Sequence, residues 1–458
     1  MRPLLRRRRT PYGSAVFARF RHPAQIIVWA FAAAIAVGTA LLSLPISTAS
    51  GESAGPLTAG LTATSAVCLT GLLTVDVAAY WSAFGKVVII ALIQVGGLGI
   101  MTLATLFALL VSGRLGLRAR LLAQAETKVL YGDELRKVIL RIVAFSLLSE
   151  TALATVLSLR LALGHGEPAG RAIPLGVFHA ISAFNNAGFA LWPDSLTRFV
   201  GDPWIVLPVA CAVIVGGLGF PVVFELVRSW RRPGTWSVLT RITVGVSAVL
   251  LVGGTLLFTV AEWRNPQTLG ALPDRYKVVA GFFTAVMPRS GGFSVIDVSA
   301  MRQESWLLTD ALMFIGGGSA GTAGGIKVTT FGLLAFVIWA ELRGEDRVNV
   351  GNRRLAGPVQ RQALTIALLS VGIVAVGTFI LLVMVPHTLD RVLLEVVSAF
   401  ATVGLSTGIT PQLPPAGQVL IIVLMFIGRV GPLTVFSALA LRERTRRYEL
   451  PEERPIVG

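Results

Sequence analysis

Four short segments of the 458-residue chain end in a turn of small residues that closes on a glycine. The turns are Leu69-Thr70-Gly71, Asn186-Ala187-Gly188, Ser290-Gly291-Gly292 and Thr402-Val403-Gly404. Consecutive closing glycines lie 188 − 71 = 117, 292 − 188 = 104 and 404 − 292 = 112 residues apart. A motif that returns at a nearly constant interval indicates an internal repeat, so we expect four copies of one unit.

The turns carry no charged side chain, so their chemistry is that of the backbone. Glycine adopts positive φ without a Cβ penalty, and it can therefore aim neighbouring carbonyl groups at a common axis. Four such turns around one axis would form rings of carbonyl oxygens that replace the water shell of a cation, as in a selectivity filter. We interpret the twelve turn residues as a filter that binds K⁺, with Na⁺ as the alternative.

A second glycine motif follows each turn, beginning its glycine run 25, 28, 24 and 24 residues after the closing glycine. Its copies are Val95-Gly96-Gly97-Leu98-Gly99, Val215-Gly216-Gly217-Leu218-Gly219, Ile315-Gly316-Gly317-Gly318 and Ile427-Gly428-Arg429-Val430-Gly431. The apolar segment before each turn is shorter than the about 20 residues that a helix needs to cross a bilayer. The repeat unit is therefore a helix, a re-entrant pore loop and a second helix.

Long apolar runs must position these turns, since 54% of the residues are apolar and 14% charged. The runs cover residues 24–46, 87–112, 142–159, 203–224, 242–261, 311–340, 363–386 and 419–441. They predict an all-α integral membrane protein with eight transmembrane helices and four re-entrant pore helices around one pseudo-fourfold pore. Irregular backbone at membrane depth must be enclosed by protein, so the four turns should face one another. The expected divisions are an N-terminal segment (1–23), repeats one to four (24–113, 114–232, 233–345 with a broken second helix, 346–441) and a C-terminal segment (442–458).

The net charge of +16 sits in alternate connections, before the first run and after the second, fourth, sixth and eighth. This is the placement that the positive-inside rule requires, and it argues against nucleic-acid binding. Both termini are therefore expected in the cytoplasm of a protein that crosses the cytoplasmic membrane many times. Cys68 and Cys211 are isolated, the four histidines are scattered, and no constellation of an enzyme is present.

The chain resembles the Trk/Ktr/HKT superfamily of potassium transporters from residue 24 to 441. Thr402-Val403-Gly404-Leu405 is similar to the filter core of potassium channels, and Arg289-Ser290-Gly291-Gly292-Phe293 and Gly428-Arg429-Val430-Gly431 are similar to motifs of the superfamily. Eight spans without an extra N-terminal helix pair resemble the bacterial KtrB type more than the longer TrkH type. The resemblance implies potassium uptake, a homodimer with a complete pore in each subunit, and a cytosolic KtrA-type ring that binds ATP, ADP or NAD. The chain itself should hold no cofactor, while Ser290 and Gly291 depart from the usual third turn and leave K⁺ selectivity over Na⁺ open.

Two features of the second motif suggest a gate. Arg429 interrupts an apolar run, where a central cation costs at least about 2.5 kcal/mol, and this favours a functional role. The glycines of residues 315–327 destabilise a helix by up to about 1 kcal/mol each and predict a loop within the membrane. By resemblance, Arg429 projects into the pore below the filter and the loop closes the pore, with Lys327 holding the closed state. The predicted gate residues are Gly316, Gly317, Gly318, Gly321, Gly324, Gly325, Lys327 and Arg429.

Other readings of the sequence stay open. Asp76, Asp194 and Asp297 follow three of the turns and either concentrate cations at the mouth or are ordinary loop carboxylates. Glu150 is the one candidate for a buried acid, and we expect it to be satisfied by partners and not to mark a proton or sodium path. The rival functions are a secondary transporter with broken helices, which fourfold repetition disfavours, and a less selective Na⁺/K⁺ transporter. Dependence of transport on sodium is a further possibility.

Overall fold

The computed structural model describes residues 23–112, 130–345, 347–350, 353–431 and 434. The predicted terminal segments 1–23 and 442–458 lie outside these residues, apart from Pro23, as do the last residues of the eighth predicted span other than Thr434. Within the described part, the one sheet is a small antiparallel hairpin of β1 (Asn349–Val350) and β2 (Arg353–Arg354). All other long elements are helices, and the prediction of an all-α protein is confirmed.

Each repeat consists of a first helix, a pore helix and a second helix. The first helices are α1 (Pro23–Leu42), α6 (Leu130–Gly164), α10 (Val238–Glu262) and α14 (Gly357–Met384). The pore helices are α2 (Pro56–Cys68), α7 (Ala169–Phe184), α11 (Asp274–Val286) and α15 (Leu389–Ala401). The second helices are α4 (Ala83–Ser112), α8 with α9 (Pro203–Leu218, Phe220–Ser229), α12 with α13 (Gln303–Phe314, Val328–Leu342) and α16 (Pro415–Val430), while α3 (Val77–Tyr80) is a short turn of helix in the first repeat.

Several helices begin at residues whose chemistry favours a helix start. Proline stands in the first turn of α2, α8 and α16, where its missing N–H would have no partner within the helix. At the start of α8, the Asp202 carboxylate accepts a hydrogen bond from the backbone N–H of Trp204 at 3.1 Å. Ser237 Oγ accepts one from the backbone N–H of Thr240 at 3.3 Å at the start of α10. These caps satisfy backbone donors that the first turn of a helix leaves free.

Within the described residues, each predicted span overlaps one helix or one broken pair of helices. Among the described residues, Arg136–Gly164, Val238–Glu262 and Gly357–Met384 are each long and apolar enough to cross a membrane. Shorter apolar helices cover Ile27–Leu42, Ala83–Gly99, Val328–Leu342 and Pro415–Val430. The sequence reading expected a break only in the sixth span, but the fourth is bent as well, by 103° between α8 and α9. The bend lies at Gly219, whose φ of 91° is accessible to glycine but strained for other residues.

The distribution of apolar and polar side chains over the helices is that of a membrane protein. Large apolar side chains face outward, as Leu163 and Leu342 show with exposed fractions of 84% and 78%. Polar side chains such as Ser182, Asn186 and Glu395 are instead fully buried. In water this arrangement would be unfavourable, whereas in a bilayer apolar atoms contact lipid and polar groups must pair inside the protein. The chain is therefore a multi-pass membrane protein.

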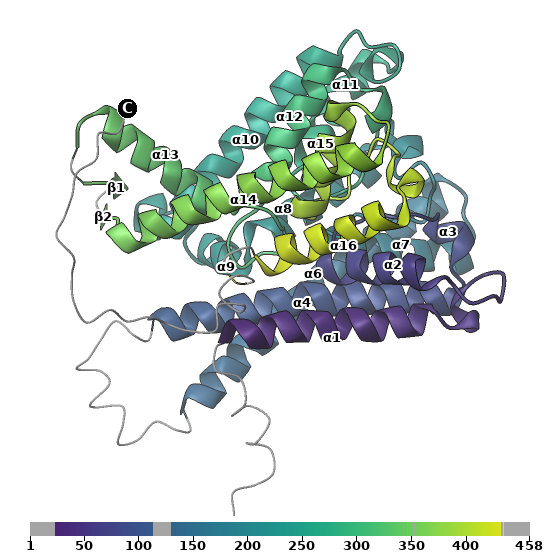
Figure 1. Cartoon of the computed structure of the whole chain (residues 1–458), viewed down its shortest axis with the longest axis horizontal. Helices are drawn as coiled ribbons and strands as arrows, with labels where there is room; N and C mark the ends of the chain where they lie inside the picture. Colours follow the sequence, from purple (N-terminus) through teal and green to yellow (C-terminus); the bar gives the residue numbers. More distant parts are fainter. Residues whose placement is uncertain (1–22, 113–129, 346, 351–352, 432–433, 435–458) are drawn as a thin grey trace, which may run out of the picture.

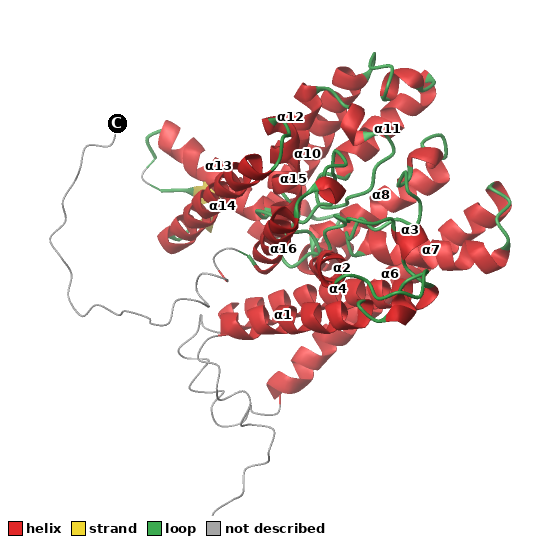
Figure 2. Ribbon diagram, turned by 45° about the vertical axis from the view of Figure 1, so that its right-hand side comes forward, coloured by secondary structure: helices red, strands yellow, loops and turns green. Residues whose placement is uncertain are grey.

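The repeats pack around a common centre. Pore helix α2 packs on α1 and α4 of its own repeat and on α16 of the fourth, α11 packs on α8, and α12 packs on α15. In Figure 1, α2, α7 and α11 lie toward the right-hand end of the molecule, while α13 and the β1–β2 hairpin lie at the left-hand end. Figure 2 shows the loops gathered between α2, α8 and α16, in the middle of the helix array. This is where the four turns meet.

Candidate ion-conduction site

The four turns share one backbone conformation. In each, the first residue and the closing glycine both have positive φ, with one residue between them. The φ values are 57° and 89° for Leu69 and Gly71, 57° and 70° for Asn186 and Gly188, 81° and 71° for Ser290 and Gly292, and 49° and 98° for Thr402 and Gly404. Positive φ costs energy for a residue with a side chain, so the surrounding structure must hold the first residue of each turn in place.

Hydrogen bonds to the pore helices hold three of the turns. The backbone N–H of the middle residue donates to the carbonyl six residues before the closing glycine: Thr70 to Ser65 (2.8 Å), Ala187 to Ser182 (2.8 Å) and Val403 to Ser398 (2.9 Å). Ser65 Oγ and Ser398 Oγ also accept from the N–H of Gly71 and Gly404, at 2.9 and 3.0 Å. With their N–H groups directed at the helices, the turns are left to present carbonyl oxygens on the opposite side.

The third turn is held differently. Val286 occupies the position of these serines, and the N–H of Gly291 donates to the carbonyl of Met287 at 2.7 Å. Ser290 Oγ instead donates to the carbonyl of Thr402 at 2.9 Å, and so links the third turn to the fourth. Arg289, nearly buried, donates to Ser247 Oγ on α10 at 2.8 Å. The third turn, whose sequence departs from the usual one, is thus also held by different hydrogen bonds.

The closing glycines lie against one another around one axis. A Cβ added to Gly404 would lie 2.1 Å from the carbonyl oxygen of Thr70, and one on Gly71 would lie 2.8 Å from that of Ala187. A Cβ on Gly188 would lie 2.9 Å from the Cα of Gly292, and one on Gly292 would lie 2.3 Å from the carbonyl oxygen of Val403. Each glycine therefore faces the backbone of the next turn, in the cyclic order one, two, three, four. No larger residue fits at any of the four positions without moving the neighbouring turn.

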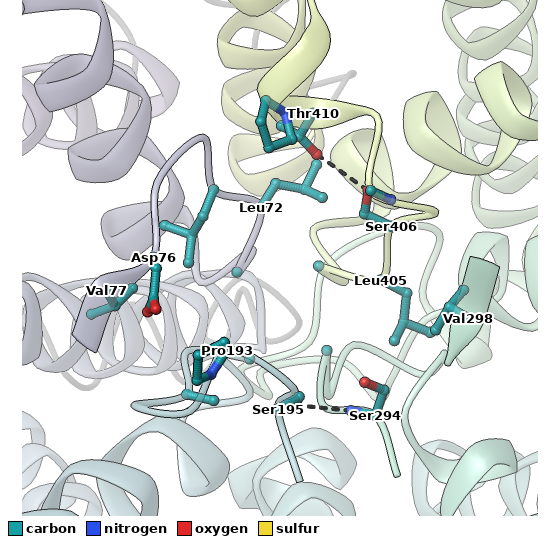
Figure 3. A pocket seen from close by; sticks show the side chains of 18 of the residues that line it. Leu72, Asp76, Val77, Pro193, Ser195, Ser294, Val298, Leu405, Ser406 and Thr410 are labelled. Atoms are coloured by element: carbon teal, nitrogen blue, oxygen red, sulfur yellow. Dashed lines mark hydrogen bonds between the residues drawn. The ribbon is translucent and has the colours of Figure 1, made fainter. Parts of the chain in front are cut away.

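A cavity of about 380 Å³ opens above the four closing glycines, all of which line it. Figure 3 shows its wall: Leu72 and Asp76 come from the first repeat, Pro193 and Ser195 from the second, Ser294 and Val298 from the third, and Leu405, Ser406 and Thr410 from the fourth. A cavity lined by all four repeats and floored by the turns is the entrance that a filter requires.

The acidic residues after the turns have mainly local partners. Asp76 lines the cavity, and its carboxylate accepts from the N–H of Ala78 at 2.8 Å at the start of α3. Asp194 pairs with Arg198 at 2.6 Å, and the hydrogen bond from Arg198 lowers the pKa of Asp194. Asp297 accepts from the N–H of Ser299 at 2.8 Å. Of the three, Asp76 alone is placed to attract cations at the mouth.

The glycines of the second motif let the second helices approach the pore helices. A Cβ on Gly96, Gly216 or Gly428 would lie 2.1, 2.0 or 1.7 Å from the carbonyl oxygen of Val67, Phe184 or Phe400. Each of these carbonyls belongs to the last turn of the pore helix in the same repeat. In the third repeat a Cβ on Gly316 would instead meet the carbonyl oxygen of Gly324. Here the second helix is interrupted between α12 and α13 by residues 315–327, which we call the inner loop.

The inner loop lies directly against the side of the turns that faces away from the outer cavity. The N–H groups of Gly318 and Thr322 donate to the carbonyls of Gly217 (2.8 Å) and Gly216 (3.2 Å) in the second repeat. Thr322 Oγ1 donates to Asn186 at 3.0 Å, and Ser290 Oγ accepts from the N–H of Gly324 at 3.2 Å. The loop is also closed on itself, because the N–H of Gly316 donates to the carbonyl of Ile326 at 2.9 Å.

Arg429 connects the fourth repeat to this loop. Its side chain is buried, and its guanidinium donates to the carbonyl of Thr322 and, at 3.4 Å, to that of Gly96. Lys327 donates to the carbonyl of Ala323 within the loop. The predicted gate residues are thus brought together, and Arg429 alone among them joins three repeats.

The structure contains more buried acidic side chains than the one that the sequence suggested. Glu150 accepts hydrogen bonds from Gln94 (3.1 Å), Ser146 (2.8 Å) and Asn185 (2.9 Å), which agrees with the expectation of a partnered acid. It is not the one buried acid, however: Glu262 and Glu395 are fully buried too. That prediction was wrong because hydroxyl donors far along the chain satisfy both: Ser305 Oγ donates to Glu262 at 2.5 Å and Ser406 Oγ donates to Glu395 at 2.7 Å.

Four pore loops that meet on one axis inside a membrane-spanning helix array define a channel-like cation transport protein. The TrkH family, described as cation transport protein, matches residues 11–444, and the chain belongs to this family. It is a transporter and not an enzyme.

The chain is similar to several known proteins along nearly its whole length. It is 40% identical over 427 residues to the Ktr system potassium uptake protein B of Bacillus subtilis, covering 93% of this chain and 95% of that protein. It is 37% identical over 436 residues to the protein of the same name from Vibrio alginolyticus (95% and 94% covered). It is 36% identical over 442 residues to the potassium/sodium uptake protein NtpJ of Enterococcus hirae (95% and 97% covered). The crystal structure of the potassium transporter TrkH from Vibrio parahaemolyticus has the same fold, with a TM-score of 0.73 at 17% identity over 95% of this chain and 87% of that one.

Proposed function

We propose that this protein takes up K⁺ across the cytoplasmic membrane through a gated, channel-like pore whose filter is formed by the twelve turn residues. The observation that carries the proposal is the closed ring of closing glycines, each against the backbone of the next turn. Carbonyl oxygens on such a ring replace the hydration shell of a cation, and the C-terminal ends of four pore helices add partial negative charge. Two similar proteins are named potassium uptake proteins, which supports K⁺ as the ion.

The inner loop and Arg429 are proposed as the gate. The loop blocks the path below the filter through hydrogen bonds to the second and third repeats, and Arg429 holds it from the fourth. A fixed guanidinium there also repels a cation that leaves the filter. Lys327 contributes by bonding the loop to itself. Release of the loop would open the path.

The orientation and assembly of the protein are further parts of the proposal. The exposed arginines Arg231 and Arg232 after α9 and Arg353 and Arg354 on the hairpin mark the cytoplasmic side by the positive-inside rule, with both termini inside. A homodimer and a cytosolic ring of KtrA type, which binds ATP, ADP or NAD, are supported by the likeness to proteins named as parts of a Ktr system. A stimulating effect of Na⁺ remains part of the hypothesis.

Each closing glycine changed to Ser tests the filter. Gly71→Ser, Gly188→Ser, Gly292→Ser and Gly404→Ser should each lose growth at low external K⁺ in a bacterium that lacks its own K⁺ uptake, and should lower the ratio of Rb⁺ to Na⁺ flux in proteoliposomes. Gly245→Ser is the matched control, because it lies on α10 with no atom within 4 Å of an added Cβ. Wild-type selectivity in all four variants would refute the filter assignment.

A less selective Na⁺/K⁺ transporter is the second candidate. The different anchoring of the third turn favours it, as does the likeness to a protein named potassium/sodium uptake protein. The same flux assay decides between the two, since this candidate requires comparable Rb⁺ and Na⁺ fluxes in the unsubstituted protein. Adding Na⁺ to the outside during Rb⁺ uptake tests the sodium effect.

A further inference from the structure

The pore helices of the second and fourth repeats carry a buried polar side chain nine residues before the closing glycine. These side chains are His179 and Glu395, with exposed fractions of 2% and 0%. Neither belongs to a turn or to the inner loop, so neither has a part in the filter or gate described above. Both bond to the segment that leads from their own turn to the outer cavity, residues 189–192 or 405–410, which we call the outer segments.

Glu395 holds the outer segment of the fourth repeat. Its carboxylate accepts a hydrogen bond from Ser406 Oγ at 2.7 Å and another from Thr410 Oγ1. Ser406 and Thr410 both line the outer cavity, and Figure 3 shows them side by side, with their hydroxyl oxygens 3.3 Å apart. Ser406 Oγ also accepts from the N–H of Gly408 at 2.9 Å. One buried carboxylate on the pore helix therefore holds the outer segment near both of its ends, at Ser406 and at Thr410.

His179 holds the outer segment of the second repeat. Its Nδ1 lies 2.7 Å from the carbonyl oxygen of Leu175 and its Nε2 lies 3.1 Å from the backbone N of Leu191. A carbonyl only accepts and an N–H only donates, so Nδ1 carries the proton and Nε2 is the acceptor. The ring also stacks on Trp192, with ring centroids 4.1 Å apart, and Trp192 lines the outer cavity. The neutral imidazole thus plays the part in the second repeat that the carboxylate plays in the fourth.

We call such a buried pore-helix side chain, bonded to the outer segment of its own repeat, a brace. The other two repeats lack one. At the same pore-helix position the first repeat has Thr62, whose hydroxyl donates to the carbonyl of Thr58 in its own helix at 2.8 Å. The third repeat has Phe283, which has no polar side-chain atom. Because the turns follow one another in cyclic order, the second and fourth repeats face each other across the axis. The two braces form an opposed pair.

We propose that His179 and Glu395 are positioning residues that fix the distance across the outer end of the filter and thereby favour K⁺ over the smaller Na⁺. The proposal rests on the proposed function of the turns as the filter. A filter discriminates by the number and placement of the oxygens it holds around an ion. An outer segment freed from its brace can close on a smaller ion, so loss of either brace should raise Na⁺ flux relative to K⁺ flux.

The test is the ratio of initial Rb⁺ to Na⁺ uptake in proteoliposomes. His179→Phe keeps an aromatic ring and removes the acceptor, and Glu395→Leu removes the carboxylate at similar volume. Each should lower the ratio by roughly threefold to tenfold, the effect of one or two net hydrogen bonds. His179→Gln restores an acceptor at similar reach and should recover most of the ratio. Thr62→Val is the matched control at the same pore-helix position and should leave the ratio unchanged.

A second variant tests the same brace in case Glu395→Leu does not fold. Ser406→Ala with Thr410→Val removes the donors on the outer segment and leaves the pore helix intact, and it should lower the ratio by the same factor. An unchanged ratio in folded His179→Phe and in the Ser406/Thr410 variant would overturn the proposal, as would an equal fall in Thr62→Val. Gly188→Ser and Gly404→Ser are measured alongside. If they lose selectivity while His179→Phe keeps it, only the braces are refuted; if they too keep it, the filter assignment fails.

Discussion

Substitution of Arg429 by Ala is expected to increase cation flux. The guanidinium is buried, and it is the group that ties α16 of the fourth repeat to the inner loop through the carbonyl of Thr322. Its second hydrogen bond, to the carbonyl of Gly96, is 3.4 Å long and therefore weak. Alanine removes both hydrogen bonds and also the positive charge below the filter. Both losses act in the same direction, toward an open path.

The magnitude follows from these contacts. A hydrogen bond from a charged donor contributes about 1.5–3 kcal/mol, and the long bond to Gly96 adds little to it. A loss of about 2 kcal/mol from the closed state changes its ratio to the open state by roughly 30-fold, since 1.4 kcal/mol corresponds to a factor of ten. For a protein that is mostly closed, the open fraction and the flux should rise by about that factor. Loss of the charge increases the flux through each open pore further.

The measurement is Rb⁺ flux into proteoliposomes that contain equal amounts of folded protein. Arg429→Lys keeps the charge and loses the planar fork, so its flux should lie between those of the wild type and Arg429→Ala. A flux in Arg429→Ala equal to that of the wild type would refute the reasoning, and so would a lower flux at normal yield. A Lys variant as active as the Ala variant would assign the effect to the hydrogen bonds and not to the charge.

Two further predictions follow from packing and charge. Gly428→Ala should abolish transport and sharply lower the yield of folded protein, because its Cβ would lie 1.7 Å from the carbonyl oxygen of Phe400; Gly372→Ala, with no atom within 4 Å of the added Cβ, should behave like the wild type in size-exclusion chromatography and flux. Asp202 accepts hydrogen bonds from Arg160 (2.7 Å) and lies 2.8 Å from His165, and although burial raises its pKa, these bonds lower the pKa overall. A lowered pKa means stability that is present above the unfolded value of about 3.9 and lost as the pH falls through the folded value. Asp202→Asn should therefore cost about 1–2 kcal/mol at pH 7 and flatten the loss of thermal stability between pH 5 and 3; an equally steep acid loss in the variant would contradict this.

The repeat architecture could be predicted because glycine has few structural equivalents. The closing glycines, and Gly96, Gly216 and Gly428 of the second motif, stand where a Cβ would meet backbone of a neighbouring segment, so their spacing records close approach directly. The apolar runs predicted the membrane spans because the thickness of the bilayer dictates how long a spanning helix must be. The loop expected at residues 315–327 lies between the end of α12 at Phe314 and the start of α13 at Val328.

The sequence could not predict contacts between repeats. The bend at Gly219 has a local signal, because Pro221 stands in the first turn of α9, but its contact with the inner loop has none: a Cβ on Gly219 would lie 2.3 Å from the carbonyl oxygen of Ser319, 100 residues later. Two partners of Glu150 are Gln94 on α4 and Asn185, which directly follows α7, and those of Glu395 come from the outer segment. Such pairings depend on how the repeats pack around the axis, which no local pattern encodes.

The four repeats are alike where the ion must be surrounded and unlike where the pore must close. At the turns, the same pair of positive φ angles recurs four times, because a ring of carbonyls needs equal contributions from all sides. Below the turns, α4 continues as one helix, α8 bends at Gly219, and in the third repeat the inner loop interrupts the second helix. In the proposed gate, the obstruction enters from only one side: it is the inner loop, which is held by hydrogen bonds to the second and third repeats and by Arg429 of the fourth. Selectivity and gating can therefore be altered separately, and variants in the turns and in the inner loop should change different properties of transport.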